Sequence, residues 1–153
     1  MRRFIVSTVA LIAPIAVAMT PSTVKADTFP AITGRPLVGS EEICFQGADF
    51  SSRVTNFGCS TSPAPRWFVP MVLRFTGTTT FRASSTGAGV APICRVMVRS
   101  AGDSFVFMAG PVSVVGSDMF LGSFNVTNLS NTALVQCNLE QAGRSLTSVR
   151  WHL

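Results

Sequence analysis

The four cysteines are the residues of this sequence whose chemistry is most sharply constrained. Cys44, Cys59, Cys94 and Cys137 could ligate a metal, exchange electrons or form disulfides. A zinc or redox site typically requires a close C-x-x-C spacing, which the sequence lacks. We therefore expect two structural disulfides, no metal site and no cofactor. Four cysteines allow three pairings, which sequence alone does not distinguish; we favour Cys44–Cys59 and Cys94–Cys137.

Acid–base and nucleophilic catalysis have little support among the residues present. The nucleophile motif G-x-S-x-G is absent, and the only histidine, His152, stands next to the last residue. A glycoside hydrolase needs only two carboxylates, so that alternative stays open. We nevertheless expect a protein that is not an enzyme, because most of the acids lie beside turns, where solvation or turn capping explains them. The acids are Glu41, Glu42, Asp49, Asp103, Asp118 and Glu140.

Three arginines form a candidate anion-binding site. Arg95 and Arg99 alternate onto the outer face of one expected strand, and Arg150 onto the outer face of another. If the two strands are neighbours, the three guanidinium groups form a stripe suited to carboxylate or phosphate groups. Anionic cell-wall polymers or lipopolysaccharide carry such groups. The alternative is that the three are solvated side chains on the polar outer face of a sheet.

Residues 67–73 are the most apolar segment after the first 26 residues. A strand here has two apolar faces, which is typical of a central strand, yet Pro70 cannot donate to a ladder and favours an edge. Two interpretations remain open. Trp67, Phe68 and Pro70 form a partner-binding surface, or the segment is a core strand bent at Pro70.

The first 26 residues have the order of a secretory signal peptide. Two arginines precede an uncharged apolar stretch, and small residues lead to Ala26, as the export channel and the signal peptidase require. We predict cleavage after Ala26, with Ala18 as an earlier alternative. An uncleaved membrane anchor is the competing interpretation. After cleavage we expect no stable membrane span, and a location in the periplasm or the medium.

Removal of the leader changes the charge balance. The full chain has 12 basic and 7 acidic residues, and three of the basic ones, Arg2, Arg3 and Lys25, belong to the leader. The basic residues that remain are all arginines. The high isoelectric point therefore partly reflects targeting, and we expect no nucleic-acid partner.

Short β-like runs separated by turn residues fill the rest of the chain. We expect an extended N-terminal arm over residues 27–41 and one domain over residues 42–153. The spacing of the runs predicts an all-β fold, an antiparallel β-sandwich of the jelly-roll or immunoglobulin-like kind. The predicted strands are 42–46, 53–59, 67–76, 79–84, 93–99, 104–109, 112–115, 119–127, 132–140 and 146–153.

Alternation along three of these runs predicts which face is buried. Residues 133, 135, 137 and 139 point to one face of their strand, as do 94, 96 and 98 of theirs. In the last run Val149, Trp151 and Leu153 are expected to point inward. Cys94 and Cys137 thus both fall on core faces, which favours a bridge between them across two strands or two sheets.

Several short pieces resemble a loose set of small, uncharacterised exported bacterial β-sandwich proteins with two disulfides. The pieces are Trp67-Phe68-Val69-Pro70, Cys94-Arg95-Val96 and Leu134-Val135-Gln136-Cys137-Asn138-Leu139, within residues 43–153. In that set a cysteine often precedes the proline, where this chain has Val69, which leaves the partner of Cys44 open. The resemblance implies no activity.

These observations favour an exported, non-enzymatic binding or structural module. Its expected partner is a cell-envelope glycan or a protein. A secreted inhibitor of a hydrolase is the first alternative, with a disulfide-rigidified loop at residues 45–58 or 60–66 presented to the enzyme. A carboxylate-dependent glycoside hydrolase is the second.

Overall fold

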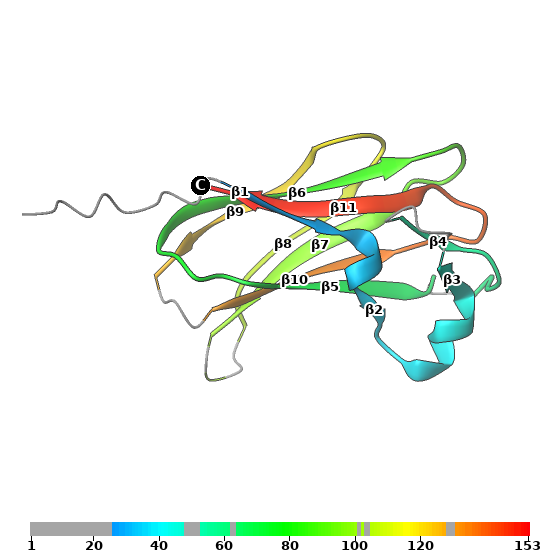
Figure 1. The fold of residues 1–153 in the computed structure, drawn as a ribbon, viewed down its shortest axis with the longest axis horizontal. Helices are drawn as coiled ribbons and strands as arrows, with labels where there is room; N and C mark the ends of the chain where they lie inside the picture. The colour runs from blue at the N-terminus through cyan, green and yellow to red at the C-terminus, as the bar shows by residue number, and fades with distance from the viewer. Residues whose placement is uncertain (1–25, 48–52, 62–63, 101, 103–104, 128–130) are drawn as a thin grey trace, which may run out of the picture.

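Two antiparallel β-sheets pack face to face in the computed structural model of this chain (Figure 1). The structure describes residues 26–47, 53–61, 64–100, 102, 105–127 and 131–153. The all-β sandwich expected from the sequence is confirmed. The predicted leader lies outside the described residues except for Ala26.

The first sheet has six strands, in the order β3-β4-β11-β6-β9, and β1 also pairs with β11. Because β6 runs along one edge of β11, the other edge is divided between two short partners: β4 meets Leu146, and β1 meets residues 148–152. The strands are β1 (Ala26–Pro30), β3 (Phe45–Gly47), β4 (Val54–Asn56), β6 (Gly77–Thr86), β9 (Met119–Val126) and β11 (Ser145–His152).

The second sheet has five strands, in the order β2-β5-β10-β7-β8. They are β2 (Arg35–Pro36), β5 (Arg66–Val72), β7 (Ile93–Arg99), β8 (Phe105–Ser113) and β10 (Thr132–Asn138). Two 3-10 helices, η1 (Ala31–Thr33) and η2 (Gly39–Cys44), connect the first strands. Among the described residues, no helix is long and apolar enough to cross a membrane.

The core lies between the sheets, where alternate residues of each strand are buried. Ala133, Val135 and Cys137 of β10 are fully buried, while their neighbours in sequence are partly exposed. The inward face predicted for β7 is likewise confirmed. In the last strand Val149 and Trp151 are buried as expected, but Leu153 is 49% exposed. The prediction for Leu153 was wrong because β11 ends at His152, so Leu153 has no strand partner to hold it inward.

Residues 27–41, expected as an extended arm, contribute to both sheets. Strand β1 pairs with β11, so that Asp27 lies opposite Trp151, and β2 pairs with β5. Between them, the carbonyl of Ala31 in η1 accepts a 2.7 Å hydrogen bond from the indole Nε1 of Trp67. The segment is therefore attached to the sandwich along most of its length.

One strand, β8, replaces the two predicted at 104–109 and 112–115. It continues through Gly110 and Pro111, and the register shifts between Cys94 and Val96 of β7 beside them. Gly110 has φ +97°, and a Cβ there would lie 2.8 Å from the carbonyl oxygen of Cys94. Only glycine fits this close approach. It allows β8 to continue through the Gly110–Pro111 pair, at which the sequence predicted that one strand ends and another begins.

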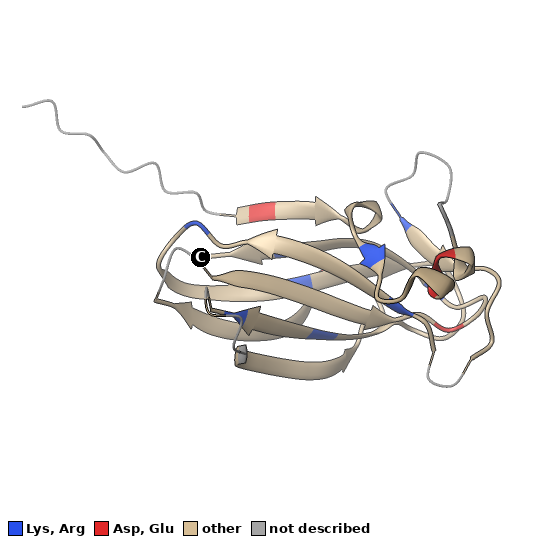
Figure 2. Cartoon of the chain, turned by 90° about the horizontal axis from the view of Figure 1, so that it is seen from below, with Lys and Arg blue, Asp and Glu red and all other residues tan. Residues whose placement is uncertain are grey.

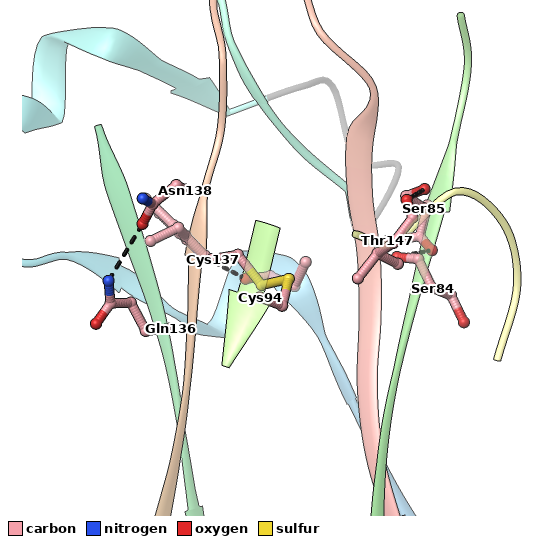
Figure 3. The surroundings of a disulfide bond; sticks show 10 residues. Ser84, Ser85, Cys94, Gln136, Cys137, Asn138 and Thr147 are labelled. Atoms are coloured by element: carbon pink, nitrogen blue, oxygen red, sulfur yellow. Dashed lines mark hydrogen bonds between the residues drawn. A yellow bond between two sulfur atoms is a disulfide. The ribbon is translucent and has the colours of Figure 1, made fainter. Parts of the chain in front are cut away.

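Both favoured disulfides, Cys44–Cys59 and Cys94–Cys137, are present. Cys94 and Cys137 stand directly opposite each other on β7 and β10, so this bridge joins two strands of one sheet. Figure 3 shows the bridge on the side of β10 that faces the other sheet, with Gln136 and Asn138 on the opposite side. Cys44 ends η2 and Cys59 follows β4, so the other bridge closes the base of the β3–β4 pair.

Candidate binding face

The three arginines predicted to form one stripe lie on opposite sides of the molecule. Arg95 and Arg99 are on β7 of the five-stranded sheet, and Arg150 is on β11 of the six-stranded sheet. The stripe does not form because these strands are not neighbours. Strand order depends on contacts between distant segments, which alternation within a strand does not reveal.

The predicted partner surface of Trp67, Phe68 and Pro70 is divided by the same alternation. Trp67 points into the core, with 8% of its surface exposed, and stacks edge-on against Phe45. Phe68 is half-buried and Pro70 exposed on the outer face of the sheet. Strand β2 pairs only with Trp67 and Phe68. Pro70 therefore lies where this edge of β5 has no described partner, which accommodates its missing N–H.

The register of the five-stranded sheet assembles an apolar platform on its outer face. Pro70 of β5, Leu134 of β10 and Met97 of β7 lie in one row across three strands, and Met108 of β8 extends it. Phe68 lies in the next row, between Arg35 of β2 and Gln136 of β10. Arg99 of β7 lies on the other side of the apolar row, opposite Thr132. We call this outer face the β5–β10–β7 face.

Two adjoining hollows lie at the β5–β10–β7 face and at its β5 edge, and Arg35 and Leu134 line both. The first has a volume of about 550 Å³, and its lining consists of Arg35, Pro36, Leu37, Phe68, Met97, Arg99 and Leu134. The second has a volume of about 590 Å³ and extends toward β1. Its lining consists of Asp27, Phe29, Arg35, Pro70, Met71, Val72, Arg74, Thr132, Ala133 and Leu134. Both volumes fall within the range of small-molecule binding sites.

Positive charge dominates this face. Arg66 lies 3.9 Å from Glu41, whereas no described acid lies within ion-pair distance of Arg35, Arg74 or Arg95. In Figure 2 the blue positions of basic residues are spread along the strands. The red positions of acidic residues are fewer and are visible at β1 and near η2. The face therefore offers guanidinium groups beside an apolar platform.

Sequence reasoning did not identify Arg35, Met97 and Leu134 as site residues. Arg35 lies in the segment expected to be an arm, and it reaches the site only through the two-residue pairing of β2 with β5. Met97 and Leu134 were recognisable as outward-facing by alternation, but nothing in the sequence places them in one row.

The outer face of the six-stranded sheet carries an ion-paired cluster of two arginines and one aspartate instead. Asp118 accepts a 3.1 Å contact from Arg82 through one carboxylate oxygen and pairs with Arg150 through the other. Arg82 also donates to the backbone carbonyl of Asp118 at 2.9 Å and lies 6.0 Å from the ring centroid of Phe120. This face leaves less charge available for a ligand than the β5–β10–β7 face.

The acids considered for hydrolysis do not all converge. Glu41 pairs with Arg66 on the outer face of one sheet, and Asp118 lies on the outer face of the other. Glu140 is exposed at the turn before β11, whereas Asp49 and Asp103 lie outside the described residues. Among the described residues, no three His, Cys, Asp or Glu side chains gather as metal ligands would.

Comparison with known proteins does not assign the chain to a family. No protein-family model and no curated protein matches the chain. Among solved structures, the chain is similar to a Podospora anserina GH26-CBM35 β-(1,4)-mannanase, with 13% identity and a TM-score of 0.45. The match covers 84% of this chain but only 27% of that chain. A structure described as "CBM4 structure and function" matches with 14% identity, a TM-score of 0.35, and 83% and 82% coverage of the two chains.

Proposed function

We propose that this chain is an exported, non-enzymatic binding module whose ligand occupies the β5–β10–β7 face. The observation that carries the proposal is the pair of adjoining hollows there, with arginines beside an apolar platform. Arginine, methionine and aromatic residues are enriched at recognition surfaces. The leader predicted by the sequence and the two disulfides support folding in an oxidising compartment outside the cytosol.

Site-specific photo-cross-linking in the native host tests the proposal. A photoreactive phenylalanine analogue replaces Val72, which is 54% exposed on β5 and lines the second hollow. The matched control carries the same analogue at Phe120, which is 50% exposed on the other sheet. We expect position 72 to capture a discrete protein or glycan that position 120 does not. Equal capture at both positions, or capture at position 120 alone, contradicts the assignment of the face.

A second candidate, a secreted inhibitor of a hydrolase, draws support from the region around the Cys44–Cys59 bridge. Ile43 is 79% exposed and Phe57 is 54% exposed, and the N–H of Phe57 donates to the carbonyl of Cys44 at 2.9 Å. Two exposed apolar side chains beside a disulfide are suited to fill pockets of an enzyme. The predicted loops, 45–58 and 60–66, lie partly outside the described residues.

Assays against a panel of proteases and lysozymes separate the two candidates. Inhibition that is lost in Ile43→Ser and Phe57→Ser, and retained when Val72 is changed to Ser, favours the inhibitor. Absence of inhibition across the panel, together with capture at position 72, favours the binding face.

A further inference from the structure

The first hollow, between β2 and β7, has an unusual lining for a protein surface. Among the described residues that line it, the charged side chains are those of Arg35 and Arg99, and the other five residues are apolar. An apolar surface hollow favours an apolar ligand, because burial of apolar area releases about 25 cal/mol per Å². No described acid lies within ion-pair distance of Arg35, so its guanidinium group is available to a ligand anion.

The two arginines stand on opposite sides of the apolar floor. Arg35 is on β2 and Arg99 on β7, with β5 and β10 between them. Three strand spacings across the sheet and four residues along β7 separate their backbones by about 20 Å. Phe68, Leu134 and Met97 form the floor between them. A ligand with an anionic group at one end can therefore bind a guanidinium while its body lies over the floor.

Packing fixes the backbone at Arg35, while its side chain is exposed. Its strand pairs with Phe68, and the preceding Gly34 fits tightly against β5, since a Cβ there would lie 2.3 Å from the carbonyl oxygen of Phe68. The hydrogen bond from Trp67 to Ala31 attaches the same segment from within the core. Preorganisation of this kind lowers the entropy cost of binding.

We infer that this hollow binds an anion that carries an apolar body, with a carboxylate or phosphate group held by Arg35 or Arg99. The inference rests on the proposed function and adds the chemical class of the ligand. Guanidinium groups bind these oxyanions through paired, charge-assisted hydrogen bonds. The floor of Phe68, Met97 and Leu134 contacts the alkyl or aryl body.

Methyl NMR of the disulfide-bonded protein, with ¹³C-labelled methionine, tests the inference directly. Met97 lines the hollow, and Met119 on β9 of the other sheet serves as the internal control. Octanoate is the probe, used well below its micelle concentration. Octylammonium has the same tail with the opposite charge, and acetate has the charge without the tail. We expect octanoate alone to shift the Met97 signal saturably, with no change at Met119.

Three arginine variants locate the anion. Arg35→Gln and Arg99→Gln should each weaken octanoate binding, and the double variant by about 10-fold or more. Arg95→Gln is the matched control, because Arg95 lies on the same strand and face as Arg99 but does not line the hollow. Unchanged binding in the double variant, or equal loss in Arg95→Gln, overturns the inference.

The outcomes separate this inference from the proposed function. Equal shifts with octanoate and octylammonium would rule out the anionic ligand and leave the proposed binding face intact. The same conclusion follows if Met97 shows no shift while position 72 still captures a partner. No shift and no capture at position 72 remove both.

Discussion

The indole Nε1 of Trp67 donates a 2.7 Å hydrogen bond to the backbone carbonyl of Ala31, and both residues are buried. This bond joins the N-terminal segment to β5, the strand that carries Phe68 and Pro70 on its outer face. The residues that face outward in the candidate site are thus supported by a polar contact inside the core.

Replacement of Trp67 by phenylalanine should destabilise the protein by about 1–3 kcal/mol, because the carbonyl of Ala31 loses its partner and part of the ring volume is lost. Thermal unfolding followed by circular dichroism measures the change. Phe68→Leu, on the outer face of the same strand, is the control and should change stability less. A Trp67→Phe protein as stable as the parent would show that the bond contributes nothing.

Asn56 provides a pH-dependent test of the buried polar contacts. Its Nδ2 donates to the carbonyls of Cys59 and Leu139 at 2.8 and 2.9 Å, and its Oδ1 accepts from the N–H of Cys59 at 3.0 Å. In Asn56→Asp a buried carboxylate would face two carbonyls, which raises its pKa in the folded state. The variant should lose about 3 kcal/mol or more at neutral pH.

The sign of the pH dependence follows from that raised pKa. Protonation of the new carboxyl relieves the repulsion, so the stability gap to the parent should be smallest below about pH 4, the usual range of an aspartate, and should widen as the pH rises. Urea unfolding of both proteins at several pH values measures the gap. A gap that is independent of pH would place the side chain in contact with solvent.

Gly122 leaves room for the opposite sheet. A Cβ there would lie 2.6 Å from the Cβ of Ala109 and 3.4 Å from a methyl carbon of Val96. Gly122→Ala should therefore cost about 1–3 kcal/mol through overpacking. The double variant Gly122→Ala, Ala109→Gly removes the closest contact and should be more stable than the sum of the two single variants indicates. Strict additivity in chemical denaturation would contradict a contact between these positions.

The two disulfides should differ in their response to reductant. Cys94 and Cys137 are fully buried, whereas Cys59 of the other bridge is partly exposed. A mild reductant at neutral pH, followed by alkylation and peptide mass spectrometry, should label Cys44 and Cys59 first, because a thiol must reach the sulfur that it attacks. Labelling of Cys94 and Cys137 at the same rate would indicate that the core opens as readily as the β3–β4 end.

Alternation within strands predicted the inward faces of β7 and β10, and it favoured the Cys94–Cys137 bridge, because the period of two is a local property of the chain. The combined site was not predictable in the same way. Alternation places both Arg150 and Arg99 on the outer face of a strand, yet the two residues belong to different sheets. Arg35 lies beside Phe68 only through the two-residue pairing of β2 with β5. Such long-range register depends on the whole topology, and no short pattern encodes it.

The pairing of β1 with β11 has a mechanical consequence. Ala26 lies opposite His152, and Pro30 lies opposite Ser148. A force that pulls residues 27 and 153 apart would open this ladder from one end, one hydrogen bond at a time, as a zipper opens. The protein should therefore yield at low force at its N-terminal strand. Further pulling could not stretch the chain between bridged cysteines, which are 15 residues apart in one disulfide and 43 in the other.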